Sequence, residues 1–565
     1  MNAERLLEHY ERIADAPDAI PRLRRFILDL AVRGKLVPQD SKDEPAAELL
    51  KRIVAEKARL LKAGEIRKGK AQSLNMATTP YELPLSWAWT SLGESFIYDA
   101  GTKREPKTLN PSLWLLELED VEKDTGRLLA RINASERESQ STKSEFRVGD
   151  VLYGKLRPYL NKVMVANEPG YSTTEIVAIR PYIPLCPQYC ALALRRPDFV
   201  DYVTRLGQGT KMPRLRTEDA VIAPFPLPPL TEQRRIVSKV DELMALCDQL
   251  EAARVEREAT RDRLATASLA RLNTPDSDPT TFANDARFAL NNLTALTSRP
   301  DQIKQFRHTI LNLAVRGKLV PQNPKDEPAV ELLRQISTNK ARPIKDRRSI
   351  NSNKNALIGE QTTSFLIPST WVWASFGDVV ISRDGERVPV SKEERSGKAK
   401  IFDYYGASGV IDRIDNYLFD KPLLLIGEDG ANLINRSTPI AFIARGKYWV
   451  NNHAHVIDGI SEEFLRYLSL FINAIDLKPY VTGTAQPKMN QAKMNSIPVA
   501  LPPLAEQHRI VARVDELMAL CDRLEASLTA GDDTRRRLLD ALLAEALAPE
   551  EGTVSEEPER VSAHG

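Results

Sequence analysis

The chain repeats part of its own sequence once, and this repeat constrains the fold more than any other feature. Residues 30–39, Leu-Ala-Val-Arg-Gly-Lys-Leu-Val-Pro-Gln, recur letter for letter as residues 313–322, at an offset of 283. Two copies with a period near half the chain are too few and too widely spaced for a solenoid. The sequence therefore predicts one structural plan that is used twice, with a pseudo-twofold relation between the copies.

Further matches bracket two regions that do not match. Trp-Ala-Trp at 87–89 returns as Trp-Val-Trp at 371–373, and Leu-Pro-Pro-Leu-x-Glu-Gln at 227–233 returns at 501–507. The inserts between these markers, from about 90 to 225 and from about 374 to 500, have little sequence in common. We interpret the chain as a nearly duplicated frame that holds two divergent inserts. Inserts that are free to diverge suggest two different targets of recognition.

A long helix is predicted to follow each Glu-Gln pair. Thr231 suits an N-cap, and a run without Gly or Pro extends to about Leu272, or ~60 Å at 1.5 Å per residue. Apolar residues repeat at steps of four and three, the spacing of a coiled-coil seam: Ile236, Val240, Leu243, Cys247 and Leu250 in the first copy, and Ile510, Val514, Leu517, Cys521 and Leu524 in the second. The second helix is expected to be interrupted near Gly531. Each stripe requires a partner helix, either from this chain or from another subunit.

The regions 5–62 and 285–340 also have helical periodicity. The N-terminus contains only the Arg-Gly-Lys-Leu part of the frame and the C-terminus only the Glu-Gln helix, whereas the centre contains both. Bringing the termini together would rebuild the central unit, so we expect a circular arrangement. Basic, apolar-poor segments at 57–70 and 340–354 are predicted to be linkers.

Within the inserts, short apolar and β-branched runs bounded by Gly, Pro and Asp predict strands at 148–154, 176–179, 423–427 and 440–443. The expected fold class is α+β, with two mixed α/β domains separated by long antiparallel, coiled-coil-like helical regions. The predicted boundaries are 1–79 for an N-terminal helical region, 80–229 for the first mixed domain, 230–359 for a central helical spacer, 360–503 for the second mixed domain, 504–548 for a C-terminal helical region and 549–565 for an acidic, disordered tail.

Composition and charge exclude several classes of protein. With 79 Lys and Arg against 77 Asp and Glu, the 565-residue chain has a formal net charge of only +2, so it is not a bulk polycation. No window approaches the roughly 20 apolar residues of a membrane span, and the start lacks the basic-then-apolar order of a signal peptide. The 4 cysteines are too few for a disulfide framework. We therefore expect a cytoplasmic protein that does not associate with membranes.

Motifs for catalysis are missing from the sequence. Residues 64–70 have the spacing of a phosphate-binding loop, but Ala71 stands where Ser or Thr must ligate magnesium. There is no Asn/Asp-Pro-Pro-aromatic tetrad of an amino-methyltransferase, no Ser-centred nucleophile elbow and no His-Glu-x-x-His. The sequence thus predicts a non-catalytic chain without a cofactor or metal of its own.

Side chains suited to nucleic acid cluster in the inserts, because Arg and Lys recognise guanine edges and phosphates while Asn and Gln recognise adenine. The candidate DNA-binding residues are Lys155, Arg157, Tyr159, Asn161, Lys162, Lys211, Arg214 and Arg216 in the first insert, and Asn432, Arg436, Asn451, Asn452, His453, His455, Lys488, Asn490 and Lys493 in the second. The spacing of His453 and His455 could suit a metal, but no third ligand lies near them in the sequence. Any one of these cations, taken alone, is more often a solvated surface charge. Their grouping on loops is the observation that favours binding of nucleic acid.

The ordered set of markers resembles the specificity (S) subunits of type I restriction-modification systems. The resemblance rests on the paired Trp-x-Trp and Leu-Pro-Pro-Leu-x-Glu-Gln motifs, on the Arg-Gly-Lys-Leu-Val-Pro-Gln repeat, and on residues 153–160 and 449–455 within the inserts. It covers nearly the whole chain apart from the tail. It implies two target recognition domains, each of which binds one half of an asymmetric, bipartite site in double-stranded DNA.

The resemblance also implies partners. Two methyltransferase (M) subunits would dock on the helical frame, and two restriction (R) subunits would join the full complex, so S-adenosylmethionine, ATP and Mg²⁺ would belong to those subunits. The docking candidates are Glu232, Gln233, Ile236, Val240, Leu243, Glu506, Gln507, Ile510, Val514 and Leu517. Two target recognition domains related by a pseudo-twofold axis would bind half-sites centred about one helical turn of DNA apart, on the order of 10 bp.

Two other functions are compatible with parts of the sequence. A helical scaffold without sequence-specific DNA binding would explain the apolar stripes but not the two divergent inserts. A complete enzyme with its own methyltransferase or nuclease site would need motifs that the sequence lacks. Salt-sensitive binding of short duplex DNA separates the first of these from a specificity subunit.

Overall fold

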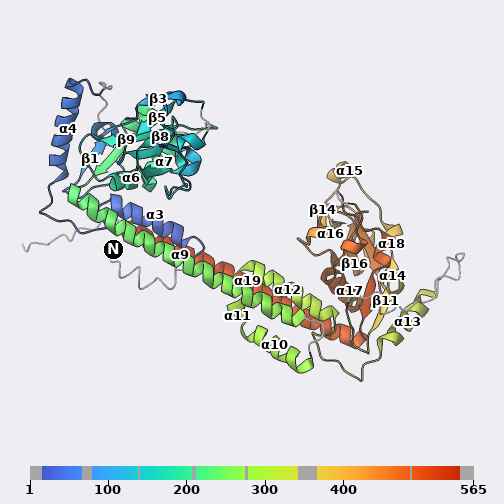
Figure 1. Cartoon of the computed structure of the whole chain (residues 1–565). Helices are drawn as coiled ribbons and strands as arrows, with labels where there is room; N and C mark the ends of the chain where they lie inside the picture. The colour runs from blue at the N-terminus through green and yellow to red at the C-terminus, as the bar shows by residue number, and fades with distance from the viewer. Residues whose placement is uncertain are drawn as a thin grey trace, which may run out of the picture. The chain divides into compact units, whose positions relative to one another are not determined.

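The computed structural model describes residues 15–66, 79–137, 140–206, 211–273, 278–341, 365–483 and 486–547. The chain divides into two compact units, the first made of residues 1–256 and 532–565 and the second of residues 257–531. Each unit combines one insert, rich in strands, with helices of the frame (Figure 1). The fold is therefore mixed helix and sheet, with long helices and two sheet-rich domains, as the sequence predicts.

The longer helices of the frame are α3 (Ala19–Val32), α4 (Ala46–Lys62), α9 (Leu230–Asn273), α10 (Pro279–Asn291), α12 (Pro300–Val315), α13 (Ala329–Ala341) and α19 (Leu504–Leu547). In the first unit the apolar stripe of α9 buries Ile236 and Val240 against Ile27 of α3. Leu539, near the end of α19, packs on Ala19 of α3. The two ends of the chain thus meet within one unit, which confirms the predicted circular arrangement.

The second unit repeats this packing with its own copies. Ile510 and Val514 of α19 bury against Ile303 and Ile310 of α12. Each stripe that was predicted to need a partner helix therefore packs on a helix of the same chain, the one that directly precedes the repeated Arg-Gly-Lys-Leu motif.

Equivalent ion pairs lock these helices in both units. Arg24 of α3 pairs with Asp248 of α9 at 2.5 Å and with Glu251 at 2.8 Å. Arg307 of α12 pairs in the same way with Asp522 of α19 at 2.7 Å and with Glu525 at 3.0 Å. The repeat in the sequence is therefore a repeat of individual contacts.

Two expectations about the frame were wrong. Helix α19 continues through Gly531 without a break, because one glycine costs a helix only about 1 kcal/mol and the following turns bury Leu539 and Leu542. The predicted linkers begin as helix: α4 extends to Lys62, and α13 includes Lys340. Lys57 and Lys340 each donate to a glycine carbonyl 2.6 Å away, so these cations hold the inserts in place. The rest of both segments lies outside the described residues, as does the predicted tail.

The elements of the first insert are β1 (Ala88–Ser91), α5 (Leu92–Ser95), β2 (Phe96–Ile97), β3 (Lys103–Arg104), β4 (Trp114–Leu116), β5 (Lys143–Phe146), β6 (Val151–Gly154), β7 (Val163–Val165), β8 (Gly170–Thr173), β9 (Ile176–Pro181), α6 (Pro187–Arg195), α7 (Pro197–Leu206), α8 (Thr217–Val221) and β10 (Pro224–Leu227). Those of the second are β11 (Val372–Ser375), α14 (Phe376–Val379), β12 (Ile381–Ser382), α15 (Lys392–Ser396), β13 (Phe402–Gly406), β14 (Gly409–Ile414), β15 (Phe419–Asp420), β16 (Leu423–Gly427), α16 (Asn432–Asn435), β17 (Ala441–Ala444), β18 (Lys447–Val450), β19 (Ala454–Asp458), α17 (Glu462–Ala474), α18 (Gln491–Asn495) and β20 (Pro498–Leu501). The four predicted strands are present as β6, β9, β16 and β17.

The two inserts share one topology although their sequences diverge. A two-stranded clasp closes each insert, β1 with β10 and β11 with β20, in the same antiparallel register. One four-stranded sheet has the order β2-β9-β6-β7 in the first insert and β12-β19-β16-β17 in the second. The other sheet shares three strands, including a parallel pair, and differs in its edge strand, which is β3 in the first insert and β14 in the second. Divergent side chains thus stand on a common backbone.

Burial raises the pKa of the Asp29 carboxyl group in α3 from 3.8 to about 6. Arg33 opposes this shift, while Asp198 and Asp201 of α7 add to it. Because the folded-state pKa lies above the unfolded one, the stabilisation by the bound proton is complete below about pH 4 and is lost as the pH rises through 6. We expect Asp29→Asn to raise the free energy of unfolding by about 1–2 kcal/mol at pH 7.5 and by nothing at pH 4. Thermal unfolding of both proteins at these two pH values would measure this, and an equal effect at both would contradict it.

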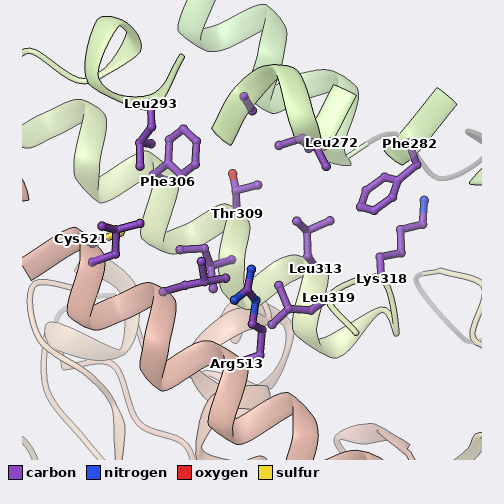
Figure 2. A pocket seen from close by; sticks show the side chains of 15 residues that line it. Leu272, Phe282, Leu293, Phe306, Thr309, Leu313, Lys318, Leu319, Arg513 and Cys521 are labelled. Atoms are coloured by element: carbon purple, nitrogen blue, oxygen red, sulfur yellow. The ribbon is translucent and has the colours of Figure 1, made fainter. Parts of the chain in front are cut away.

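A mostly apolar pocket lies in the second unit between α10, α12, α19 and the end of α9 (Figure 2). Leu293 and Phe306 line one part of it, and Lys318 and Arg513 are its charged side chains. Arg513 is already paired with Glu516 at 2.5 Å. We therefore regard the pocket as a gap in helix packing. Within the described residues, no helix combines the length and apolarity that a membrane crossing requires.

Candidate nucleic-acid interface

The repeated motifs of the frame converge on one buried carboxylate in each unit. Glu232, in the first turn of α9, accepts hydrogen bonds from the indole of Trp87 at 2.9 Å and from the amide of Gln39 at 2.6 Å. Glu506 accepts the same bonds from Trp371 at 3.0 Å and Gln322 at 2.6 Å. Burial raises the pKa of both carboxyl groups, and the two donated bonds oppose that shift. The Trp-x-Trp, Pro-Gln and Glu-Gln motifs therefore recur because they form one cluster.

This cluster corrects the prediction that these residues dock another subunit. The docking candidates Glu232, Gln233, Ile236, Val240, Glu506, Gln507, Ile510 and Val514 are all buried inside the chain. Leu243 and Leu517 are half-buried against the same cores. A side chain without exposed surface cannot contact a partner, so the eight buried residues hold the frame together. Docking of a partner on Leu243 and Leu517 stays a prediction.

In the first insert the two basic loops predicted from the sequence form one surface. Residues 155–162 follow β6, and residues 211–216 precede α8; we call them together the first double loop. The Arg157 N–H donates to the Pro213 carbonyl at 2.7 Å, and the Leu215 N–H donates to the Lys155 carbonyl at 2.9 Å. These two bonds hold the backbones of the loops side by side.

The first double loop has an excess of unpaired positive charge. The exposed Arg214 pairs with Glu175 at 3.0 Å. Lys155, Arg157, Lys211 and Arg216 form no side-chain hydrogen bond or ion pair within the described part of the chain. Tyr159 stands among them with 43% of its surface exposed. Cations without partners, beside an exposed ring, form a surface suited to a polyanion.

Two other candidates in this insert have structural roles. Asn161 is buried with φ 51°, and its amide donates to the carbonyl of Arg195 at the end of α6. Lys162 donates to the carbonyl of Leu118 at 2.7 Å. Both are therefore corrected from DNA contacts to contacts that fix the loop on the domain.

The second insert contains an equivalent surface. Residues 428–436 follow β16, and residues 486–490 precede α18; we call them together the second double loop. The Gly430 N–H donates to the Pro487 carbonyl at 2.9 Å, and the Met489 N–H donates to the Glu428 carbonyl at 2.8 Å. The first double loop has the same two backbone bonds at the equivalent positions, although the side chains at those positions differ.

The charges of the second double loop are largely paired. Lys488 lies 3.2 Å from Glu428, which also accepts a hydrogen bond from Arg387 at 2.8 Å. Burial opposes ionisation of Glu428, but these cations outweigh it and lower the pKa of the carboxyl group. The exposed His453 pairs with Asp429 at 2.7 Å. This surface thus presents polar groups with less free positive charge than the first.

Among the remaining candidates, Asn452, Asn490 and Lys493 are exposed beside this surface. Asn490 also caps α18, where its side chain accepts the Lys493 N–H at 2.9 Å. These three, with His453 and Lys488, are the candidates in the second insert that remain able to contact DNA.

Four candidates in the second insert are engaged in bonds within the domain. The buried His455 bonds to Asp384 at 2.6 Å and to the Met489 carbonyl at 2.8 Å, so it shares no ligand site with His453. Burial opposes ionisation of Asp384, but His455, the Val456 N–H and Arg387 together outweigh it and lower the pKa of that carboxyl group. The other three are Asn451, which is buried and accepts the His453 N–H, Asn432, which is half-buried and whose amide closes its own loop onto Thr438, and the half-buried Arg436.

Arg436 shows why residue type alone gave a wrong prediction of DNA contacts. With φ 51° it ends α16, and its guanidinium donates to the carbonyls of Ile472 and Ile475 at the end of α17, where a cation is favourable. Asn161 does the same for α6 in the first insert. A polar residue on a loop was thus mistaken for a ligand contact in both inserts.

The sequence interpretation also missed residues of the site. Four acids, Glu175, Asp384, Glu428 and Asp429, organise the two surfaces, yet acids were not considered as candidates. Arg387, which pairs with Glu428, was also missed. One signal was available: Gly-Thr-x-x-Pro at 209–213 recurs at 483–487, at an offset of 274 inside the divergent inserts. It marks the segment that leads into each double loop.

No group of three or more His, Cys, Asp and Glu side chains is placed to hold a metal within the ranges that the structure describes. The chemistry available at the two double loops is thus hydrogen bonding and charge.

Comparisons with known proteins agree with this chemistry. A family model described as the type I restriction modification DNA specificity domain matches residues 368–530. The chain is 30% identical to the type I restriction enzyme EcoEI specificity subunit of Escherichia coli, over 94% of each chain. It is 29% identical to the EcoAI specificity subunit of the same species, over 93% of each chain.

Solved structures give a weaker likeness. One, from a study of complex assembly and conformational transition of the type I R-M system, is 19% identical with a TM-score of 0.48, covering 83% of this chain and 99% of that one. The HsdS subunit of Thermoanaerobacter tengcongensis is 19% identical with a TM-score of 0.44, covering 84% and 99%.

Proposed function

Because this chain belongs to the family of type I restriction enzyme specificity subunits, we propose that its two inserts each bind one half of an asymmetric, bipartite site in double-stranded DNA. The first double loop would contact one half-site and the second double loop the other. The base pairs between the two half-sites would not be recognised. The chain would act in the cytoplasm, where the DNA to be protected or cut is found.

The observation that best supports this proposal is the pair of double loops. Both rest on the same two backbone hydrogen bonds, yet they present different side chains: Lys155, Arg157 and Arg216 in one, and Glu428, Gly430 and Asn490 at the equivalent places in the other. One backbone with two sets of contact groups suits two half-sites of different sequence.

The chain would not catalyse a reaction itself. Two methyltransferase subunits would dock on exposed faces of the helical frame, and two restriction subunits would complete the nuclease. S-adenosylmethionine, ATP and Mg²⁺ would then be bound by those partners. The methyltransferases would have to turn an adenine out of the stack at each half-site to reach it.

Neutralising the first double loop tests its role in DNA binding. We expect the triple variant Lys155→Gln, Lys211→Gln, Arg216→Gln to lower the affinity of the methyltransferase complex for duplex DNA by roughly a hundredfold at about 0.15 M salt, because each lost phosphate contact lowers the salt-dependent affinity several-fold. Titration of a labelled duplex at several salt concentrations would measure both the affinity and its salt dependence.

A charge-matched variant controls for net charge. Arg104, Lys123 and Arg127 lie in the same insert but are already in ion pairs with Glu145, Asp124 and Glu122. Their replacement by glutamine should change the affinity by less than threefold. Equal losses in both triple variants, or no loss in either, would contradict the assignment of the surface.

A further inference from the structure

The backbone of Arg157 has an unfavourable conformation. Its φ is 50° and its ψ is 59°, the left-handed region that residues with a Cβ rarely occupy. Pro158 follows, and a residue before proline ordinarily has an extended backbone. The bond from the Arg157 N–H to the Pro213 carbonyl holds the residue in this state.

The second insert shows that the loop does not need an arginine here. Gly430 occupies the equivalent place, donates the equivalent bond to Pro487, and has a φ of 105°. Glycine adopts positive φ without a steric penalty, so it is the residue that this backbone favours. An arginine at this position is therefore explained by something other than the fold of the loop.

The surroundings of the Arg157 side chain point to an anion. The side chain is exposed and forms no hydrogen bond or ion pair among the described residues. The neighbouring Lys155, Lys211 and Arg216 also have no ion-pair partner among the described residues, and Glu175, which lies at the same surface, pairs with Arg214. Exposed Asn or Gln side chains, which would recognise a base, are missing from the described part of this double loop. Four unpaired cations grouped on one surface suit the closely spaced phosphate oxygens of DNA. Arginine also recognises guanine edges, and the experiment below separates the two kinds of contact.

We propose that Arg157 is a phosphate anchor of the first insert, held in a strained backbone so that its guanidinium contacts the DNA backbone rather than a base. This deepens the proposed function and rests on it. Strain at a single residue that the rest of the fold does not require is typical of residues kept for binding.

The variant Arg157→Gly tests the proposal, because strain relief and loss of binding have opposite consequences. We expect the melting temperature to stay the same or rise by up to about 2 °C. We expect the affinity of the methyltransferase complex for duplex DNA to fall roughly five- to tenfold at about 0.15 M salt, equally for duplexes with and without the methylated motif. The slope of log affinity against log salt concentration should fall by about one.

Two further variants define the outcome. Arg157→Lys should retain affinity within about threefold, since a phosphate requires the charge and not a bidentate donor. Arg104→Ala, which removes an ion-paired cation of the same insert, should leave affinity unchanged. An unchanged affinity in Arg157→Gly, a lower melting temperature, or a methylated motif that becomes degenerate at one base would each overturn the proposal. If the wild-type complex itself bound no DNA, the proposed function would fail instead.

Discussion

Replacing Glu232 by alanine is expected to lower the free energy of unfolding of the first unit by about 3 kcal/mol. The substitution removes a buried carboxylate that accepts the indole N–H of Trp87 and the amide N–H of Gln39. The indole N–H of Trp87 would then be buried without a partner, at a cost of about 1–3 kcal/mol, and the exposed amide of Gln39 would lose the shorter of its two bonds. The carboxylate also lies in the first turn of α9, where the helix dipole favours a negative charge.

The duplication of the frame supplies a matched control for this prediction. Glu506→Ala should destabilise the second unit by a similar amount, because Trp371 and Gln322 lose the same acceptor. Each variant should move the transition of its own unit and leave the other in place. Glu232→Gln retains an acceptor and should cost only about 1 kcal/mol.

Unfolding in denaturant, monitored by hydrogen exchange of the amides of each unit separately, would measure these changes in stability. A loss spread equally over both units in either variant would contradict the local role of the cluster. A change below 0.5 kcal/mol in Glu232→Ala would contradict its structural role altogether.

The sequence predicts the frame well because the frame is repetitive and its signals are local. The 4-3 spacing from Ile236 onward correctly gives a long helix with one buried stripe. Which helix covers that stripe is a non-local matter, and the answer, α3 in the first unit, follows only once the chain is folded. The effect of Gly531 was misjudged for the same reason, because tertiary packing of the turns after it outweighs its low helix propensity.

The candidate site could be predicted only in part. Arg157 and Lys211 lie on the surface where the sequence suggests, whereas Asn161 and Arg436 cap helices and His455 lies in the interior. Residue type alone does not distinguish a donor that faces solvent from one that satisfies a helix end. That distinction depends on which helix end lies beside each loop after folding, because Arg157, Asn161 and Arg436 all have the same left-handed backbone.

The near-neutral charge of the chain illustrates a related limit. A net charge of +2 conceals the fact that most charged side chains of the frame are in ion pairs, as with Arg24 and Arg307, while four cations of one double loop are not. Folding sorts charges into paired and unpaired sets, and binding of a polyanion depends on the unpaired set.

Under the proposed function, each insert determines one half of the DNA site. Replacing residues 92–223 by residues 376–497 would give a chain with two copies of the second insert. The junctions suit the exchange, since β1 with β10 and β11 with β20 have the same register. In the native chain Tyr189 packs on Trp87 and Tyr467 packs on Trp371, in both cases with ring centroids 6.3 Å apart and nearly perpendicular planes. In the chimera Tyr467 would therefore pack on Trp87 in the place of Tyr189.

The measurement is the methylated motif in the genome of cells that express this chimera with its methyltransferase partner. We expect the half-site of the first insert to disappear and the half-site of the second to appear twice, in inverted orientation, as a gapped palindrome. A motif that keeps the first half-site, or one in which both halves change, would contradict the account.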